Sequence, residues 1–250
     1  MLQNFYSVLW INIYTLSQSN IKEAQNTKRT TAKDIFENEA LIDQENRNTE
    51  KESTFNDNKE TDEFLDKVFE ELSKMRWQPS IRTMPPFFDN PLYINALNSS
   101  VQKHIESLEW IPEILLTSYH GLPKRYLDLG DPYHCHCHKT TRLLKEKLNY
   151  FSGETILAFQ SRFGPEEWLK PYTEETVINL AKNGCESLAI LSPAFISDCV
   201  ETLEEINIGI KEVFFENGGK NFTLIPCLND SLDGITLLRK LIANELKGWI

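Results

Sequence analysis

The sequence predicts an α/β fold in which a parallel β-sheet is flanked by helices on both faces. Within residues 113–250, short apolar runs alternate with longer segments of helical period, and turn signals separate the two. Parallel strands need a long crossover between them, usually a helix, and strands covered on both faces are continuous apolar runs. The predicted strands are 113–119, 155–161, 187–193 and 222–228.

Helices are predicted before and between these strands. Asn90 is expected to cap a helix that has Pro91 at its first position. A second helix is expected from about Cys137 to Asn149. Thr173 is predicted to cap a third helix, which stops at Gly184. The remaining helices are predicted at 62–75, 198–217 and 234–248.

Residues 1–60 are predicted to be a low-complexity, disordered segment. From Ser17 to about Glu60 the chain is rich in Asn, Gln, Glu, Lys and Thr and poor in large apolar residues, so this stretch cannot bury enough surface to fold. The run FYSVLWINIYTL near the start is shorter than the about 20 residues of a transmembrane helix. We interpret it as a remnant strand at 5–14, with an interfacial membrane segment as the alternative. The folded region is predicted at 61–250.

Charge and cysteine content limit the partners and the compartment. The formal net charge is −11, which disfavours binding to the phosphate backbone of nucleic acids. The 5 cysteines are odd in number and scattered along a long chain, which is not typical of a disulfide framework. The sequence therefore favours the reducing cytoplasm.

A single histidine is a candidate for chemistry at the end of the first predicted strand. Ligands of parallel sheets bind beyond the carboxyl ends of the strands. His120, in TSYHGLP, follows the strand directly, and Gly121 and Pro123 form a turn after it. The alternative is a structural histidine that bonds a loop carbonyl.

Three carboxylates follow the third predicted strand. Asp198, Glu201 and Glu205, in SDCVETLEE, are spaced three and four apart and are expected on one helix face. Such a row suits a relay of protons or cations, and a solvated acidic first turn is the alternative. Because one sheet edge collects the ends of both strands, His120 and Glu201 are expected to lie across one cleft.

The run GDPYHCHCHKTT holds five residues that bind metals elsewhere: His134, Cys135, His136, Cys137 and His138. One intervening residue is tighter than the usual zinc-ligand spacing of two to four. In a strand the histidines and thiols would face opposite sides, and at a helix start only His134 and His138 would pair. The spacing therefore argues against an active site in this run, and an accessory metal site is the alternative.

Several long motifs together resemble the ferrochelatase family, in the order in which that family carries them. They are TSYHGLP, GDPYHCHCHKTTRLL, AFQSRFGPEEWLKPYTEET and SPAFISDCVETLEEI, preceded by KVFEELSKMRWQPSIR. The resemblance runs from about Thr61 to the C-terminus. It implies a chelatase-like fold with one complete Rossmann-like half, the first half being largely missing.

The resemblance implies insertion of Fe²⁺ into protoporphyrin IX, the last step of haem synthesis. His120 falls on the family's metal-binding and proton-accepting histidine, and Glu201 on its partner glutamate. Asp198 and Glu205 fall on an acidic line for porphyrin or proton traffic, and Trp77 on an aromatic position near the pocket. No cofactor beyond substrate Fe²⁺ is expected, and a [2Fe–2S] cluster is not expected because it needs four grouped cysteines.

The short first part of the chain leaves other functions open. An inactive chelatase that binds metal or haem is one alternative, and a cobalt or other tetrapyrrole chelatase is another. The expected partners are porphyrin and Fe²⁺, with no nucleic acid. The oligomeric state is open, and so is peripheral contact of a cytoplasmic protein with a membrane.

Overall fold

The computed structural model describes residues 63–249. The boundary predicted near residue 60 and the strand predicted at 5–14 lie outside the described residues. The described chain divides into two units, residues 63–82 and residues 83–249, and each is described by itself. The first unit contains helix α2 (Glu63–Lys74), which agrees closely with the helix predicted at 62–75.

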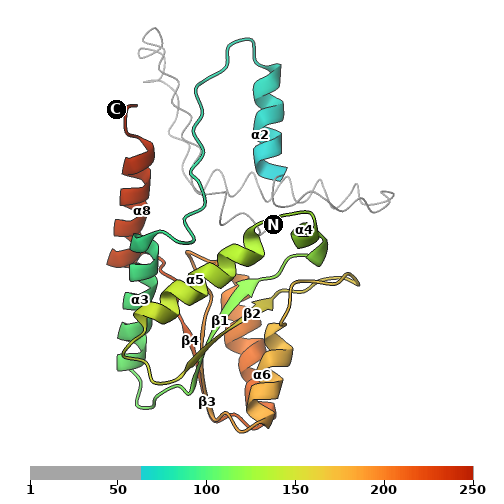
Figure 1. Cartoon of the computed structure of the whole chain (residues 1–250), viewed down its shortest axis with the longest axis vertical. Coiled ribbons are helices and arrows are strands. Elements are labelled where there is room, and N and C mark those ends of the chain that lie inside the picture. Colours follow the sequence, from blue (N-terminus) through green and yellow to red (C-terminus); the bar gives the residue numbers. More distant parts are fainter. Residues whose placement is uncertain (1–62, 250) are drawn as a thin grey trace, which may run out of the picture. The chain divides into compact units, whose positions relative to one another are not determined.

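The second unit is built on a four-stranded parallel sheet, as predicted (Figure 1). Its strand order is β2-β1-β3-β4, so the first and third strands in the chain are direct neighbours. Strands β1 and β2 pair over their whole length and end together, with His120 opposite Gln160. The strands are β1 (Ile114–His120), β2 (Glu154–Gln160), β3 (Ser187–Leu191) and β4 (Asn221–Ile225).

Most of the predicted helices are confirmed, including the Asn90 cap, and two details differ. The Asn90 side chain caps α3 by accepting a hydrogen bond from the Leu92 amide at 2.9 Å. Thr173 is the first residue of α6 rather than its cap, because Tyr172 occupies the cap position. The single helix predicted at 198–217 is a π-helix followed by an α-helix. The helices are α3 (Pro91–Glu106), α4 (Lys124–Asp128), α5 (Tyr133–Lys147), α6 (Thr173–Lys182), π-helix η1 (Glu201–Ile210), α7 (Lys211–Glu216) and α8 (Leu232–Glu245).

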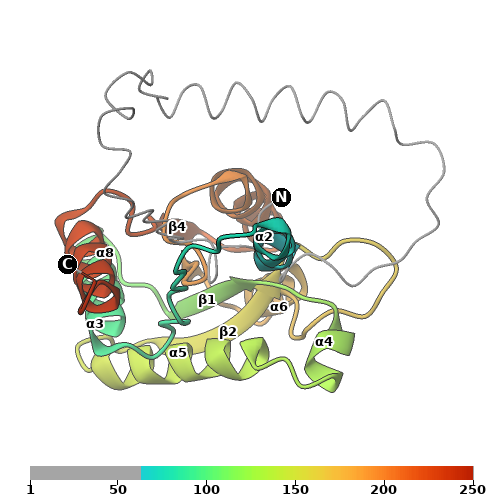
Figure 2. The same cartoon turned by 90° about the horizontal axis from the view of Figure 1, so that it is seen from above.

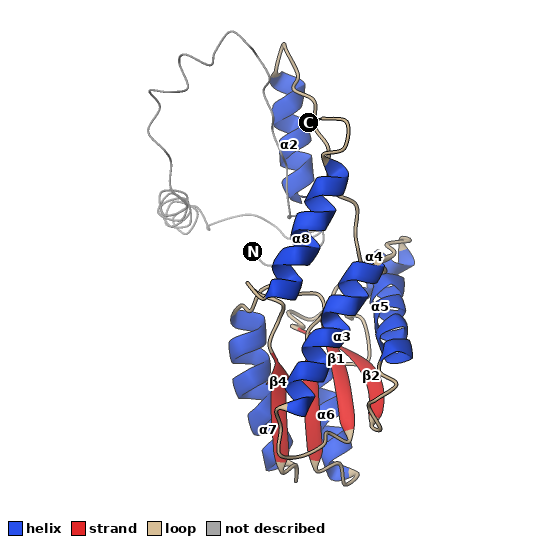
Figure 3. Ribbon diagram, turned by 90° about the vertical axis from the view of Figure 1, so that its left-hand side faces the viewer, coloured by secondary structure: helices blue, strands red, loops and turns tan. Residues whose placement is uncertain are grey.

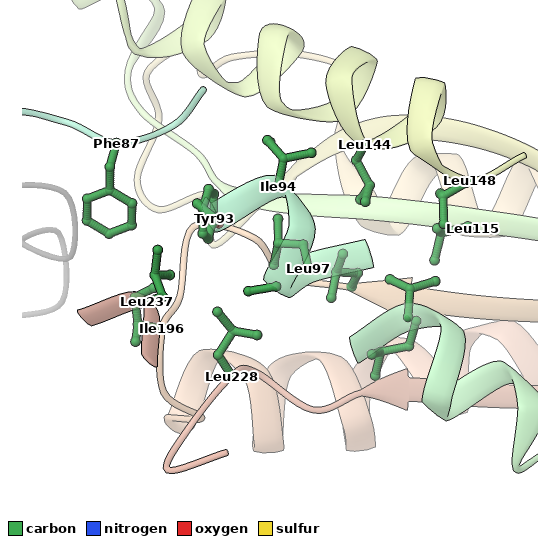
Figure 4. Packing of buried hydrophobic residues seen from close by; sticks show 14 of the residues in the cluster. Phe87, Tyr93, Ile94, Leu97, Leu115, Leu144, Leu148, Ile196, Leu228 and Leu237 are labelled. Carbon is green, nitrogen blue, oxygen red and sulfur yellow. The ribbon is translucent and has the colours of Figure 1, made fainter. Parts of the chain in front are cut away.

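Helices cover both faces of the sheet, as the apolar strands predict (Figures 2 and 3). Successive strand residues point to opposite faces, so Leu115 packs with one set of helices and Leu116 with the other. The first cluster joins β1 to α3, α5 and α8, and Figure 4 shows Leu115 and Leu144 within it. The second cluster joins the sheet to α6, η1 and α7. Burial of each large apolar side chain contributes about 1.5–3 kcal/mol.

A third apolar cluster lies where the strands end and contains Tyr119, Phe159 and Phe195. This cluster packs the ends of the strands against the segments that follow them. Among residues 63–249, no helix has both the length and the apolar character that crossing a membrane requires.

Candidate active site at the carboxyl edge of the sheet

His120 is the last residue of β1, and its ring is held by a backbone contact. Its Nδ1 lies 2.6 Å from the Gly121 carbonyl oxygen. A carbonyl oxygen only accepts hydrogen bonds, so Nδ1 carries the proton and Nε2 of the neutral ring is the basic nitrogen. The rings of Trp168 and Phe195 each lie 6.4 Å from the His120 ring, centroid to centroid.

Gly121 allows the turn after β1 to approach β2 closely. The Gly121 amide donates to the Gln160 carbonyl at 2.8 Å. A Cβ at residue 121 would lie 2.8 Å from the same oxygen and 3.1 Å from the Trp168 ring. Only glycine fits this approach, and the approach positions the carbonyl that orients His120.

Gln160 connects the histidine strand to the π-helix. Its side chain is 3% exposed, and its Oε1 accepts from the Ser118 hydroxyl at 2.7 Å. Its Nε2 donates to the Glu201 carbonyl oxygen at 2.9 Å. Because Ser118 and His120 belong to the same strand, this buried amide side chain joins β1 to the backbone of η1 at Glu201.

Glu205 lies one turn further along η1 and binds the end of β2. Its Oε1 accepts from the Ser161 amide at 2.7 Å, and its Oε2 accepts from the Ser161 hydroxyl at 2.6 Å. Ser161 adopts a positive φ of 62°, which is uncommon outside glycine. This backbone conformation occurs where the Ser161 amide and hydroxyl both reach one carboxylate.

Glu201 presents a carboxylate oxygen that lacks a hydrogen-bond donor. Its Oε2 is buried and accepts no hydrogen bond from the described residues. A buried carboxylate oxygen without a donor is costly, so this atom is a candidate contact for a cation. Two more buried polar atoms, Trp168 Nε1 and Ser192 Oγ, also have no hydrogen-bond partner among residues 63–249, and they belong to residues that follow strands β2 and β3.

Asp198 has a different set of partners from the two glutamates. Its Oδ1 accepts from the Thr202 hydroxyl at 3.0 Å and its Oδ2 from the Asn229 amide at 2.7 Å. The Cys227 amide also donates to Oδ1 at 3.3 Å. Asp198 therefore connects the start of η1 to the segment after β4, whereas Glu205 binds the end of β2.

Cys199 lies between Asp198 and Glu201 in the sequence. Burial raises the pKa of its thiol to about 11, and the nearby Glu201 carboxylate adds to the rise. Without a bound metal, the thiol is therefore protonated at neutral pH.

Trp77 belongs to residues 63–82, and its side chain is 63% exposed. That Trp77 is an aromatic residue near the porphyrin pocket, as the family resemblance implies, stays a prediction.

The alternating run occupies the first turns of α5, because this helix begins at Tyr133, four residues earlier than predicted. His134 and His138 lie together, with their Nε2 atoms 3.2 Å apart. His136 stacks on Phe88, Cys135 is exposed, and Cys137 is fully buried. The structure thus brings two of the five residues together and separates the other three.

Sequence reasoning identified the end of β2 but assigned no role to its residues. Gln160 and Ser161 hold Glu201 and Glu205 in place. The available signal was their position directly after an apolar strand, at the same edge as His120.

The fold and the site together define an α/β protein that offers imidazole and carboxylate groups at the carboxyl edge of a parallel sheet. This set of groups suits protons and divalent cations.

Residues 58–246 match the family model described as ferrochelatase. The chain belongs to the ferrochelatase family. It is 54% identical over 185 residues to the ferrochelatase of Agrobacterium fabrum, which covers 74% of this chain and 54% of that protein. The Rhizobium meliloti ferrochelatase is also 54% identical, and that of Brucella ovis is 55% identical, with 55% and 53% of their lengths covered. The chain spans about half the length of the curated relatives it matches.

Among solved structures, a cobalamin (vitamin B12) biosynthesis CbiX protein from Marinobacter aquaeolei aligns with a TM-score of 0.38 and 15% identity. The alignment covers 54% of this chain and 98% of that protein.

Proposed function

We propose that this chain inserts Fe²⁺ into protoporphyrin IX to form haem, with His120 and Glu201 handling the metal and the protons. Its family membership supports the reaction class. The observation that carries the proposal is the Glu201 carboxylate oxygen, which is buried without a donor among the described residues. The backbone carbonyl of the same residue accepts a hydrogen bond from Gln160, whose strand pairs with the His120 strand.

The reaction needs groups of this kind. A free-base porphyrin carries two pyrrole N–H protons, and insertion of Fe²⁺ gives the iron porphyrin and two released protons. Nε2 of a neutral His120 is suited to accept one proton or to hold Fe²⁺ before transfer. The Glu201 carboxylate suits a hard divalent cation or the second proton.

A weak and open site fits a metal that must be handed on. Imidazole and carboxylate together bind Fe²⁺ less tightly than a closed set of thiolates would. The raised pKa of Cys199 supports this assignment, because the thiol that lies nearest in sequence to Glu201 is held protonated. Such a site suits a metal ion that is transferred to the porphyrin rather than one that stays bound to the protein.

Glu205 is proposed as the next group along the proton path. It is adjacent to Glu201 on η1 and is fixed by Ser161, and the Gln160 amide lies 3.5 Å from its Oε2. Asp198 is proposed to act on the same path by positioning η1, since its carboxylate oxygens already accept three hydrogen bonds. Trp77 is proposed as a porphyrin contact on the family resemblance alone.

The remaining partners and the compartment are also proposals. The chain is assigned to the cytoplasm, with peripheral membrane contact as an open addition, and its ligands are porphyrin and Fe²⁺. We propose no cofactor beyond substrate iron. Burial raises the pKa of the Cys137 and Cys227 thiols far above the usual range, which opposes ligation of a [2Fe–2S] cluster by these residues.

A second candidate is a metal- or haem-binding module without turnover. Such a module would bind a cation or haem through the same imidazole and carboxylate groups, without the contacts over the rest of the porphyrin that bend the macrocycle.

Anaerobic incubation of the chain with Fe²⁺ and protoporphyrin IX separates the two functions. A haem absorption band that grows faster than in the protein-free mixture supports the enzyme. Folded protein that gives only the protein-free rate supports the binding module. The same assay with Co²⁺ in competition tests the cobalt chelatase alternative, which predicts faster insertion of cobalt than of iron.

A further inference from the structure

The start of α5 brings two imidazole rings together outside the candidate active site. His134 and His138 are one helical turn apart, with ring centroids separated by 4.4 Å and Nε2 atoms by 3.2 Å. The two Nε2 atoms are therefore closer to each other than the ring centres are.

We propose that His134 and His138 form a two-imidazole surface site for a borderline divalent cation such as Zn²⁺. The separation of the two nitrogens carries this inference. With Zn–N bonds of about 2.0–2.1 Å, two ligands at a tetrahedral angle are about 3.3–3.4 Å apart, and at a right angle about 2.8–3.0 Å. The observed 3.2 Å falls between these values, so one ion can contact both nitrogens without movement of the backbone.

The two rings are supported in this arrangement by their surroundings. The His134 ring is nearly parallel to the Phe159 ring, with an interplanar angle of 20° and a centroid distance of 5.7 Å. His138 follows on the next turn of the same helix and is solvent-exposed. A half-buried ligand therefore fixes one side of the site, while the other side is open to entering ions and water.

The three neighbouring residues of the run do not complete the site. The Cys137 side chain is 0% exposed and packs in the cluster at the strand ends. The His136 ring stacks on Phe88 with centroids 3.6 Å apart. No group of three or more metal-binding side chains occurs within residues 63–249. The site therefore supplies two nitrogens, and water supplies the remaining ligands of an exchangeable ion.

The chemistry of the ligands selects the class of ion. Neutral imidazole suits Zn²⁺, Cu²⁺, Ni²⁺ and iron, whereas Mg²⁺ and Ca²⁺ prefer oxygen. The competing explanation for the short separation is a hydrogen bond in which one Nε2 donates to the other. That arrangement needs no ion, so the two explanations predict different responses to metal.

The proposal is tested by titration of the whole chain with Zn²⁺ alone, in the absence of porphyrin. The titrations use a His120→Ala/Glu201→Gln background, so that metal binding at the candidate active site does not contribute. Isothermal calorimetry is expected to detect one bound Zn²⁺. His138→Gln should weaken this binding by about tenfold or more, because one of two protein ligands is lost.

His136→Gln is the matched control, since it removes a histidine from the same helix without touching the pair. It should bind Zn²⁺ as the background protein does. His134→Phe keeps an aromatic ring against Phe159 and should lose binding while its circular dichroism stays unchanged. Histidine-ring NMR signals of residues 134 and 138 should shift on addition of Zn²⁺.

Absence of Zn²⁺ binding by the folded background protein overturns the proposal. Equal Zn²⁺ affinity in the background and in the His138→Gln variant overturns it as well. Neither result depends on the proposed haem-forming activity.

Discussion

At the scale of single residues, the two glutamates of the candidate site differ in the hydrogen bonds that their carboxylates accept. Its Oε2 is buried and has no donor among the described residues, whereas both oxygens of Glu205 are held by Ser161. The two carboxylates are neighbours on one π-helix but have different surroundings. Glu201 is therefore the one available to a cation or a proton that arrives from outside the chain.

Replacement of Glu201 by Gln tests this assignment. The amide keeps the shape of the side chain but cannot take up a proton or neutralise Fe²⁺. The initial rate of haem formation should fall by about 10²–10⁴-fold, the usual contribution of a positioned acid–base group. Glu204→Gln is the control, because Glu204 is exposed on the same helix. A Glu201→Gln rate equal to that of the control contradicts the assignment.

The principal residues of the site could be predicted from the sequence, but their connection could not. His120, Glu201 and Glu205 follow from the positions of strand ends and from the motif resemblance. Gln160 was recognised only as part of a strand end, because its importance lies in buried hydrogen bonds to Ser118 and to Glu201. These bonds depend on how three distant segments pack, which residue spacing does not report.

At the scale of elements, the turn after β1 sets the position of His120. The Gly121 amide reaches the Gln160 carbonyl, and the Gly121 carbonyl accepts from the imidazole. One residue therefore fixes both the spacing of the two strand ends and the protonated nitrogen of the histidine.

Gly121→Ala should destabilise the fold and move His120. The added Cβ would lie 2.8 Å from the Gln160 carbonyl oxygen, and a clash of this kind costs about 1–3 kcal/mol. Urea denaturation measures the loss, and the haem-formation rate should fall with it.

Gly209→Ala is the matched control within η1, where an added Cβ would meet only one atom, at 3.8 Å. It should be neutral or stabilising by up to about 1 kcal/mol. If both substitutions have the same effect on stability, the close approach at Gly121 is not the determining contact.

The sequence predicted whether a segment is a helix or a strand more reliably than it predicted where the element ends and which kind of helix it forms. The four apolar runs became the four strands, with shifts of up to three residues at their ends. The start of α5 was placed too late, because the polar residues from Tyr133 onward lack the apolar period that marks a helix. The π-helix was missed because its apolar spacing differs little from that of an α-helix, and its wider turns are rare.

At the scale of the whole unit, residues 83–249 bury titratable groups whose charge affects stability. Burial lowers the pKa of His104, which lies between α3 and β4 and is 2.7 Å from the Thr223 hydroxyl. Burial also lowers the pKa of His136. In each case the unfolded chain takes up a proton more readily than the folded one.

The free energy of unfolding should therefore decrease as the pH falls below about 6.5, the usual histidine value. Stability rises with pH wherever the unfolded state binds more protons, so the contribution is complete above pH 6.5 and is lost as the pH falls toward the folded pKa. Urea denaturation at pH 7.5 and 5.5 measures the difference. His104→Gln should reduce it, and an unchanged difference in that variant would remove His104 as a source.

The central claim is that His120, at the carboxyl edge of the sheet, takes part in metal insertion. The most direct measurement is the initial rate of haem formation from Fe²⁺ and protoporphyrin IX by the wild-type chain and by His120→Ala, under anaerobic conditions. The account predicts that the wild-type chain exceeds the protein-free rate and that His120→Ala lowers the protein-dependent rate by about 10²-fold or more. A folded His120→Ala variant that forms haem at the wild-type rate would contradict it.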